Sequence, residues 1–192
     1  MIDLTPATGR MAGLLATVTD EELGMPTPCE RMTLGDLIDH VDGLSLAFTW
    51  AAAKDPRAAE PGQGPSADAA RLGDDWRERL PRRLDALAEA WRDPAAWSGM
   101  TRAGGIDLPG EVAGLVALDE LVVHGWDIAR SLGRPYTCSA EETGACLEFV
   151  SQAPEDPEPD SGLFGPPVRV PEDAPPLDRL IGRTGRDPHW KP

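Results

Sequence analysis

The stretch that decides the fold is Leu118-Asp119-Glu120-Leu121-Val122-Val123-His124-Gly125-Trp126-Asp127-Ile128-Ala129-Arg130. Apolar residues recur in it at helical spacing, and Gly133 followed by Pro135 predicts where the helix ends. Glu120 and His124 are four residues apart, so they lie one above the other on one face of that helix. A carboxylate and an imidazole placed in this way can bind one metal ion together.

The sequence holds only three histidines, which makes their positions informative. His40 lies in a second strongly helical run, on the same broad face as its apolar residues. We interpret His40, Glu120 and His124 as a three-ligand metal site. Two simpler interpretations stay open: a hydrogen-bonded core histidine, or a Glu–His surface pair at the common spacing of four. The metal is favoured because Glu120 and His124 are flanked by apolar residues, and a buried carboxylate needs a partner.

Composition narrows the class of protein. The 192 residues suffice for one domain with a sizeable core, or one domain with a tail. A net charge of −15 argues against binding to nucleic acid and equally against an anionic membrane surface. Cys29, Cys138 and Cys146 form no C-x-x-C pair and fit reduced thiols. With no secretory signal and no apolar run of membrane-spanning length, we expect a cytoplasmic protein.

Helical periodicity predicts five helices, at about 5–18, 33–53, 66–91, 109–132 and 139–152. The predicted N-caps are Thr5, Thr33, Ser66 and Ser139. Asp36 and Glu142 complete capping boxes with the second and fourth of these. Pro81 is expected to kink or interrupt the third helix. No strand pattern stands out.

The fold class predicted from these patterns is all-α. A metal-binding helical bundle is expected over residues 1–152. A proline-rich tail follows over residues 153–192, packed on the bundle or partly extended, with a short helix at about 177–181.

Three motifs carry a resemblance: Pro26-Thr27-Pro28-Cys29-Glu30, Thr33-Leu34-Gly35-Asp36-Leu37-Ile38-Asp39-His40 and Asp119-Glu120-Leu121-Val122-Val123-His124-Gly125-Trp126-Asp127-Ile128-Ala129. They resemble the DinB-like metal-binding bundles, in the branch that includes the metal-binding domain of mycothiol-dependent maleylpyruvate isomerase. The closing Phe164-Gly165-Pro166-Pro167-Val168 and Gly185-Arg186-Asp187-Pro188 resemble the tail of an uncharacterised subgroup there. The likeness runs from about Thr5 to Trp190.

The resemblance implies a DinB-like four-helix bundle with an additional C-terminal helix and, by family analogy, a homodimer. It also implies a divalent metal, zinc before nickel, held by His40, Glu120 and His124, and chemistry with a low-molecular-weight thiol such as mycothiol. Two departures limit it. Met32 stands where the family leads us to expect Trp, and only a proline-rich tail follows the bundle where the isomerase has a second domain. Maleylpyruvate isomerisation itself is therefore not expected.

Two histidines and one glutamate leave at least one metal position open, as in catalytic zinc sites. The first hypothesis is a thiol S-transferase or isomerase that acts on a small electrophilic substrate. A second is a zinc hydrolase that needs no thiol. A third is a non-catalytic helical dimer without metal, in which the three residues only satisfy one another.

Other residues near these motifs carry further predictions. Asp36, Asp39 and Asp127 lie within one helical turn of a ligand and could orient the imidazoles, although we interpret at least two of them as solvated. Trp126 is expected in the core. We interpret Cys29 as a small buried loop residue rather than a reactive thiol, and His189 as a structural or surface residue.

Overall fold

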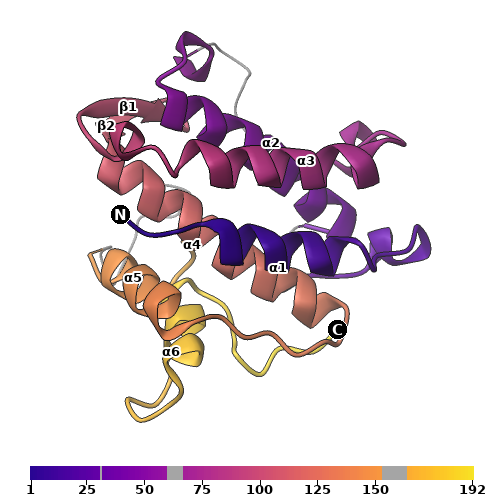
Figure 1. The fold of residues 1–192 in the computed structure, drawn as a ribbon. Coiled ribbons are helices and arrows are strands. Elements are labelled where there is room, and N and C mark those ends of the chain that lie inside the picture. The colour runs from indigo at the N-terminus through magenta and orange to yellow at the C-terminus, as the bar shows by residue number, and fades with distance from the viewer. Residues whose placement is uncertain (31, 60–66, 153–163) are drawn as a thin grey trace.

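Four long helices pack side by side in the computed structural model, which describes residues 1–30, 32–59, 67–152 and 164–192 (Figure 1). They are α1 (Thr5–Leu15), α2 (Leu34–Ala53), α3 (Trp76–Ala90) and α4 (Gly110–Ser131). Helices α1 and α2 each contact both α3 and α4, which closes a four-helix bundle. The predicted all-α bundle is thus confirmed.

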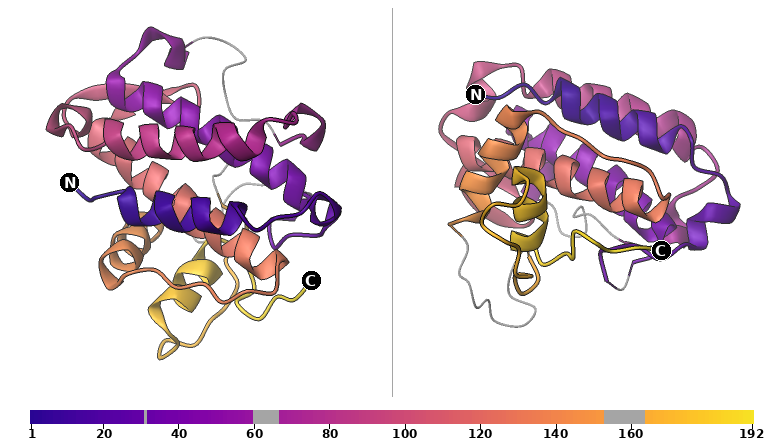
Figure 2. Two further views of the ribbon diagram at one scale, coloured as in Figure 1. Left: turned by 45° about the vertical axis from the view of Figure 1, so that its right-hand side comes forward. Right: turned by 90° about the horizontal axis from the view of Figure 1, so that it is seen from below.

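Two shorter helices lie outside the bundle. Helix α5 (Ala140–Val150) packs on α4, and α6 (Pro176–Arg183) packs on α5. Short 3-10 helices occupy the connections: η1 (Glu21–Gly24), η2 (Pro56–Ala59), η3 (Ala69–Arg71) and η4 (Pro94–Trp97). In both views of Figure 2, α5 and α6 lie together on the α4 side, and the C-terminus lies near the end of α4.

The predicted capping boxes explain where two helices begin. At α2, the Thr33 hydroxyl accepts from the Asp36 amide at 3.2 Å, and the Asp36 carboxylate accepts from the Thr33 amide at 2.9 Å. At α5, Ser139 and Glu142 exchange the same two bonds, at 3.1 and 2.7 Å. Each box satisfies two amides that the first helical turn leaves without partners.

The first helix begins at Thr5 as predicted, but its predicted cap and end were wrong, and so was the predicted start of the third helix. Helix α1 is capped at Leu4, because the Asp3 carboxylate accepts the Thr5 amide and hydroxyl, and it ends at Leu15. The predicted cap Ser66 lies outside the described residues. Helix α3 starts only at Trp76, since Gly73 has a left-handed φ of +70° that ends any helix before it.

Of the two effects expected of Pro81, an interruption of α3 is ruled out. The helix runs on through Ala90 and buries Leu80, Leu84 and Leu87 in the bundle core. This packing compensates for the backbone hydrogen bond that proline cannot donate.

An unpredicted β-hairpin precedes α4. Strands β1 (Met100–Ala103) and β2 (Ile106–Pro109) pair antiparallel, with Ala103 opposite Ile106. The two-residue turn is Gly104-Gly105, with φ values of +58° and +82°. Two positive φ angles in succession are what a type I′ hairpin turn needs, and glycine adopts them without strain.

The proline-rich tail was expected to be extended over 153–176. Residues 153–163 lie outside the described part, and residues 164–175 contain no helix or strand. Helix α6 is longer than the predicted 177–181, and it buries Leu180 and Ile181 completely. Among the described helices, none combines the length and apolar character needed to cross a bilayer.

Two tryptophans pack against the start of α4. The Trp91 and Trp97 rings meet edge to face with centroids 5.1 Å apart. Trp91 donates to the Phe48 carbonyl oxygen at 3.2 Å, and Trp97 donates to that of Trp91 at 2.8 Å. A Cβ atom on Gly114 would come within 2.6 to 2.9 Å of both rings, so α4 can pack here only with glycine.

Gly114→Ala should therefore destabilise the protein by about 1–3 kcal/mol, although alanine favours a helix more than glycine does. Gly144→Ala is the matched control, because a Cβ atom on this exposed α5 residue would meet nothing within 4 Å among the described residues. It should stabilise by up to about 1 kcal/mol. Urea denaturation of both variants measures the difference; equal effects would contradict the packing role of Gly114.

Candidate metal centre

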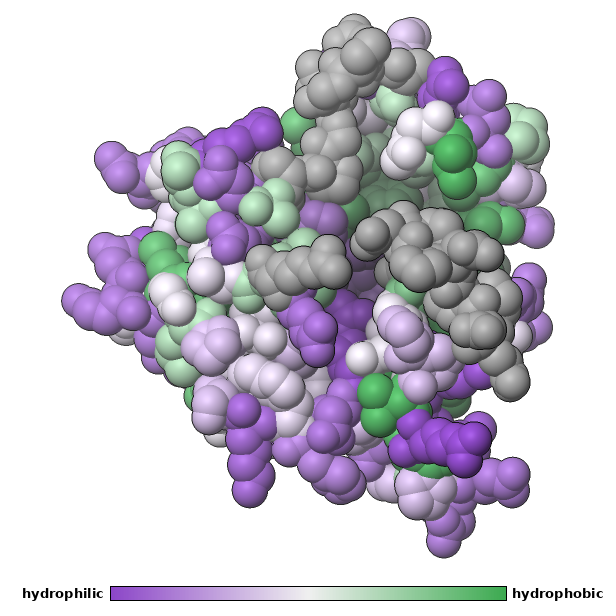
Figure 3. Space-filling model, turned by 180° about the vertical axis from the view of Figure 1, so that it is seen from behind, coloured by the Kyte–Doolittle hydropathy of each residue, from purple (hydrophilic) through white to green (hydrophobic). Residues whose placement is uncertain are grey.

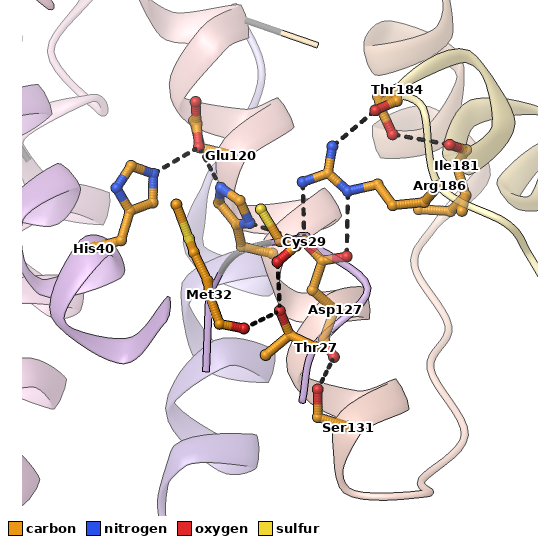
Figure 4. Close-up of polar contacts among 11 residues, drawn as sticks. Thr27, Cys29, Met32, His40, Glu120, Asp127, Ser131, Ile181, Thr184 and Arg186 are labelled. Atoms are coloured by element: carbon orange, nitrogen blue, oxygen red, sulfur yellow. Dashed lines mark hydrogen bonds and ion pairs between the residues drawn. The ribbon is translucent and has the colours of Figure 1, made fainter. Parts of the chain in front are cut away.

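The three predicted ligands lie together at the contact between α2 and α4 (Figure 4). Glu120 Oε2 lies 2.9 Å from His124 Nε2 and 3.8 Å from His40 Nε2. The two imidazole rings meet edge to face with centroids 5.1 Å apart. One potential ligand atom from each residue lies within 4.8 Å of the other two. The positions of these residues along α2 and α4 thus bring all three side chains within reach of a single metal ion.

The site lies inside the bundle but has an accessible side. The His124 side chain is 8% exposed, whereas those of His40 and Glu120 are 17% and 20% exposed. A small molecule can therefore reach His40 and Glu120 more easily than His124.

Asp127 determines which nitrogen of the His124 ring carries a proton. His124 Nδ1 lies 2.9 Å from Asp127 Oδ2, and the Asp127 side chain is fully buried. Burial alone would raise the pKa of Asp127, but the cation of Arg186 and the hydrogen bond with His124 lower it below its usual value. The ionised Asp127 accepts from Nδ1–H, so Nε2 is the nitrogen turned toward Glu120.

A cation must lie between His124 Nε2 and Glu120 Oε2, because two lone pairs 2.9 Å apart would repel each other. Burial alone would lower the pKa of His124, but hydrogen bonds with Asp127 and Glu120 raise it to about 9. Burial alone would likewise raise the pKa of Glu120, but bonds with His124 and His40 lower it. The group between them is either a proton on His124 or a metal ion, and two imidazoles with one carboxylate fit a divalent cation.

Arg186 is a site residue that sequence patterns missed. Its Nε and Nη2 donate to the two carboxylate oxygens of Asp127 at 3.2 and 3.0 Å. The two residues are 59 positions apart, and no periodicity relates them. The Gly185-Arg186-Asp187-Pro188 motif was the signal that pointed to this part of the chain.

Cys29, which we interpreted as a small buried loop residue, lies beside the site. It is half-buried, and its Sγ belongs to a second group of possible ligand atoms with His124 and Asp127. The Thr27 hydroxyl lies 2.9 and 3.0 Å from the carbonyl oxygens of Cys29 and Met32, which holds the loop before α2 in place. Burial raises the pKa of the Cys29 thiol, although Arg186 acts in the opposite direction. Cys29 is therefore a neutral thiol beside the site.

The other predicted residues have varied roles. Asp36 caps α2 and also accepts from the Ala69 amide at 2.8 Å, and Asp39 is buried and accepts from the Asp68 amide at 3.2 Å. The interpretation of two solvated acids was wrong, because Asp39 and Asp127 are buried and Asp36 is half-buried. Two further expectations agree with the structure: Trp126 is buried below the Arg130 guanidinium, and His189 is exposed.

The part of the chain that holds His40, Glu120 and His124 matches a known family. The model of the mycothiol maleylpyruvate isomerase N-terminal domain matches residues 4–129. The chain belongs to this family. The match includes His40, Glu120, His124 and Asp127 but not Arg186.

Relatives and solved structures agree with this family membership. Two uncharacterised proteins of Mycobacterium tuberculosis, from strains CDC 1551 and H37Rv, are each 30% identical in an alignment 191 positions long, which covers 91% of this chain and 91% of theirs. The crystal structure of mycothiol-dependent maleylpyruvate isomerase matches with a TM-score of 0.55 at 20% identity, and that of a mutant with 0.56 at 21%. Each match covers 77% of this chain and 64% of the isomerase chain. The isomerase structures thus share the bundle fold with this chain, and the shared part is less than two thirds of the isomerase chain.

In metal-free protein, the His124 proton should make stability depend on pH. The folded-state pKa of about 9 lies above the ordinary value of 6.5, so this contribution is complete below pH 6.5 and is lost as pH rises through 9. Between these values, the free energy of unfolding should fall by up to about 1.4 kcal/mol per pH unit more in wild type than in His124→Gln. Urea denaturation of both, with a chelator present, measures this. Parallel pH curves would contradict a proton shared with Glu120.

Proposed function

We propose that this protein is a divalent-metal-dependent enzyme of small-thiol chemistry, a thiol S-transferase or isomerase that acts on a small electrophile. The observation that carries the proposal is the convergence of His40, Glu120 and His124, with His124 Nδ1 held by Asp127 at 2.9 Å. Three protein ligands with an accessible side are typical of catalytic sites. A divalent ion bound there would lower the pKa of a thiol at its open position and keep it as the nucleophilic thiolate.

The thiol part of the proposal comes from the family. The isomerase with the same bundle is described as mycothiol-dependent. We transfer to this chain the use of a low-molecular-weight thiol such as mycothiol, and not maleylpyruvate isomerisation, because the match covers only 64% of the isomerase chain.

The chain's own residues decide from which side a substrate can enter. Behind Glu120, toward the bundle interior, lies an apolar crevice with a volume of about 10 Å³, room for about one water molecule. It is lined by Met11, Val41, Leu44, Ser45, Phe48, Leu87, Ala117, Glu120 and Leu121. A substrate does not fit there, so it has to approach His40 and Glu120 from their exposed side. The apolar lining leaves room for no more than about one water molecule on the other side of Glu120.

The face shown in Figure 3 gives little support to an obligate helical dimer. On the face shown in Figure 3, apolar residues of the described part are scattered among polar ones and form no broad apolar area. An obligate helical dimer would need a large apolar interface. A homodimer with a smaller interface stays part of our proposal.

We further propose that residues 1–152 form the metal-binding domain and that the tail over 153–192 packs on it, as α6 does on α5. Zinc is the first candidate metal and nickel the second. A cytoplasmic location would keep Cys29, Cys138 and Cys146 reduced, and none of the three is in a disulfide.

Purified, tag-free protein should contain close to one zinc or nickel ion per chain. Glu120→Gln and His124→Ala should each lose most of it, because each removes one of three ligands. Glu111→Gln is the control, since this exposed acid lies on the same helix away from the site. Elemental analysis of all four proteins checks this. Wild type that stays metal-free after incubation with both metals would overturn the proposed site.

Activity should require the thiol as well as the metal. With mycothiol or a simpler thiol and a small electrophile, wild type should accelerate conjugation, and Glu120→Gln should lose at least about 100-fold in kcat/KM. Loss of free thiol, followed spectroscopically, measures the rate. Metal-loaded protein that hydrolyses esters or amides without any thiol would favour the zinc-hydrolase alternative and contradict the thiol proposal.

A further inference from the structure

The end of α6 delivers one arginine to the metal centre. The Gly185 amide bonds to the Gly182 carbonyl oxygen and the Arg186 amide to that of Ile181, both at 3.1 Å. With Gly185 at φ +85°, these two bonds form a Schellman motif that ends the helix and fixes where the next residue points. A Cβ atom on Gly185 would lie 2.9 Å from the Gly165 backbone, so the motif is also packed against the chain before α6.

Arg186, Asp127 and His124 form a buried row, of which Figure 4 labels Arg186 and Asp127. Their side chains are 10%, 0% and 8% exposed. The guanidinium donates to both oxygens of Asp127 and, through Nη1, to the Thr184 carbonyl oxygen at 2.9 Å. Asp127 Oδ2 in turn meets His124 Nδ1. Two bonds from a planar guanidinium leave the carboxylate one orientation, in which it faces the histidine.

We propose that Arg186 is a positioning residue for the metal centre, which links docking of the C-terminal segment (residues 176–190) to metal binding. The inference rests on the proposed metal site. Arg186 lies outside residues 4–129 that match the family model, so the family match does not include this link.

The expected loss of metal affinity follows from the contacts among Arg186, Asp127 and His124. Loss of a group that orients a ligand histidine typically weakens metal binding 10- to 100-fold. Without Arg186, Asp127 keeps its carboxylate but loses the two bonds that aim it at His124. The link is reciprocal: any factor by which the docked tail strengthens metal binding is the factor by which metal stabilises the docked tail.

A second tail contact supplies a matched control. Arg130 Nη2 donates to the Pro188 carbonyl oxygen at 2.6 Å, and its guanidinium lies over Trp126. Arg130 thus ties the same segment to α4 through a backbone carbonyl, whereas Arg186 does so through the Asp127 carboxylate. Arg130→Met should weaken docking of the tail. As long as more than half of the molecules keep the tail docked, the apparent metal affinity should fall less than about twofold.

The test compares zinc and nickel dissociation constants of wild type, Arg186→Met, Arg186→Lys and Arg130→Met by competition with a chromophoric chelator, at one pH. Arg186→Met should bind about 10- to 100-fold more weakly than wild type, with Arg186→Lys in between, because an ammonium holds one oxygen only. Hydrogen exchange of segment 176–190 is measured with and without metal. Metal should slow exchange there in wild type and in Arg130→Met, and not in Arg186→Met.

Unchanged affinity in a folded Arg186→Met protein would overturn the proposal and make Arg186 only a tie between tail and bundle. If Arg186→Met does not fold, wild type decides: metal-bound protein with unchanged exchange in segment 176–190 also overturns it, and slowed exchange supports it. Wild type that binds neither metal would overturn the proposed function together with this inference, whereas the first two outcomes leave the metal site intact.

Discussion

The structure depends on one fully buried carboxylate, that of Asp127. A lone carboxylate in the interior of a bundle is strongly unfavourable unless every acceptor position has a partner. Here the partners come from two directions: the His124 ring one helical turn back, and the guanidinium of Arg186 from the far end of the chain. Because neither partner alone would satisfy it, this one carboxylate joins the candidate metal centre on α4 to the C-terminal segment.

The ionisable side chains in this part of α4 are arranged so that few charges are buried without a partner of opposite charge. Asp119, next to Glu120 in sequence, is 4% exposed, and its Oδ1 has no hydrogen-bond partner among the described residues. Burial, followed by the charge of Glu120, raises the pKa of Asp119 to about 8. Asp119 is therefore neutral at pH 7 while Glu120 and Asp127 are ionised. Only Glu120 and Asp127 then carry a negative charge beside the cations of the site, and Asp119 adds no third one.

Much of this could be predicted from sequence because it depends on local rules. The spacing of Glu120 and His124 and the Thr33–Asp36 capping box each involve residues within one helical turn, and the structure has both. The Gly104-Gly105 hairpin was within reach of the same rules, since a Gly-Gly pair between two short runs is a hairpin signal. The start of α3 was not, because Gly73 fits a helix poorly without excluding it.

Arg186 illustrates what local rules cannot provide. Its contact with Asp127 spans 59 residues and depends on how α6 packs and ends. In sequence it is one arginine among many in an acidic chain, with no spacing that relates it to His124. A buried acid on a predicted helix does, however, imply a distant cation, so Asp127 could have prompted a search for one.

The hydrogen bonding of the site also helps to distinguish a structural metal centre from a catalytic one. A structural zinc site holds the fold together, and the chain unfolds without the ion. Here a proton on His124 can take the place of the cation between Glu120 and the imidazole, and the bundle core of leucines and tryptophans does not involve the site. The protein is therefore expected to fold with or without metal. A metal bound at the proposed site would not be needed for the fold, and three ligands with an accessible side would give it the character of a catalytic ion.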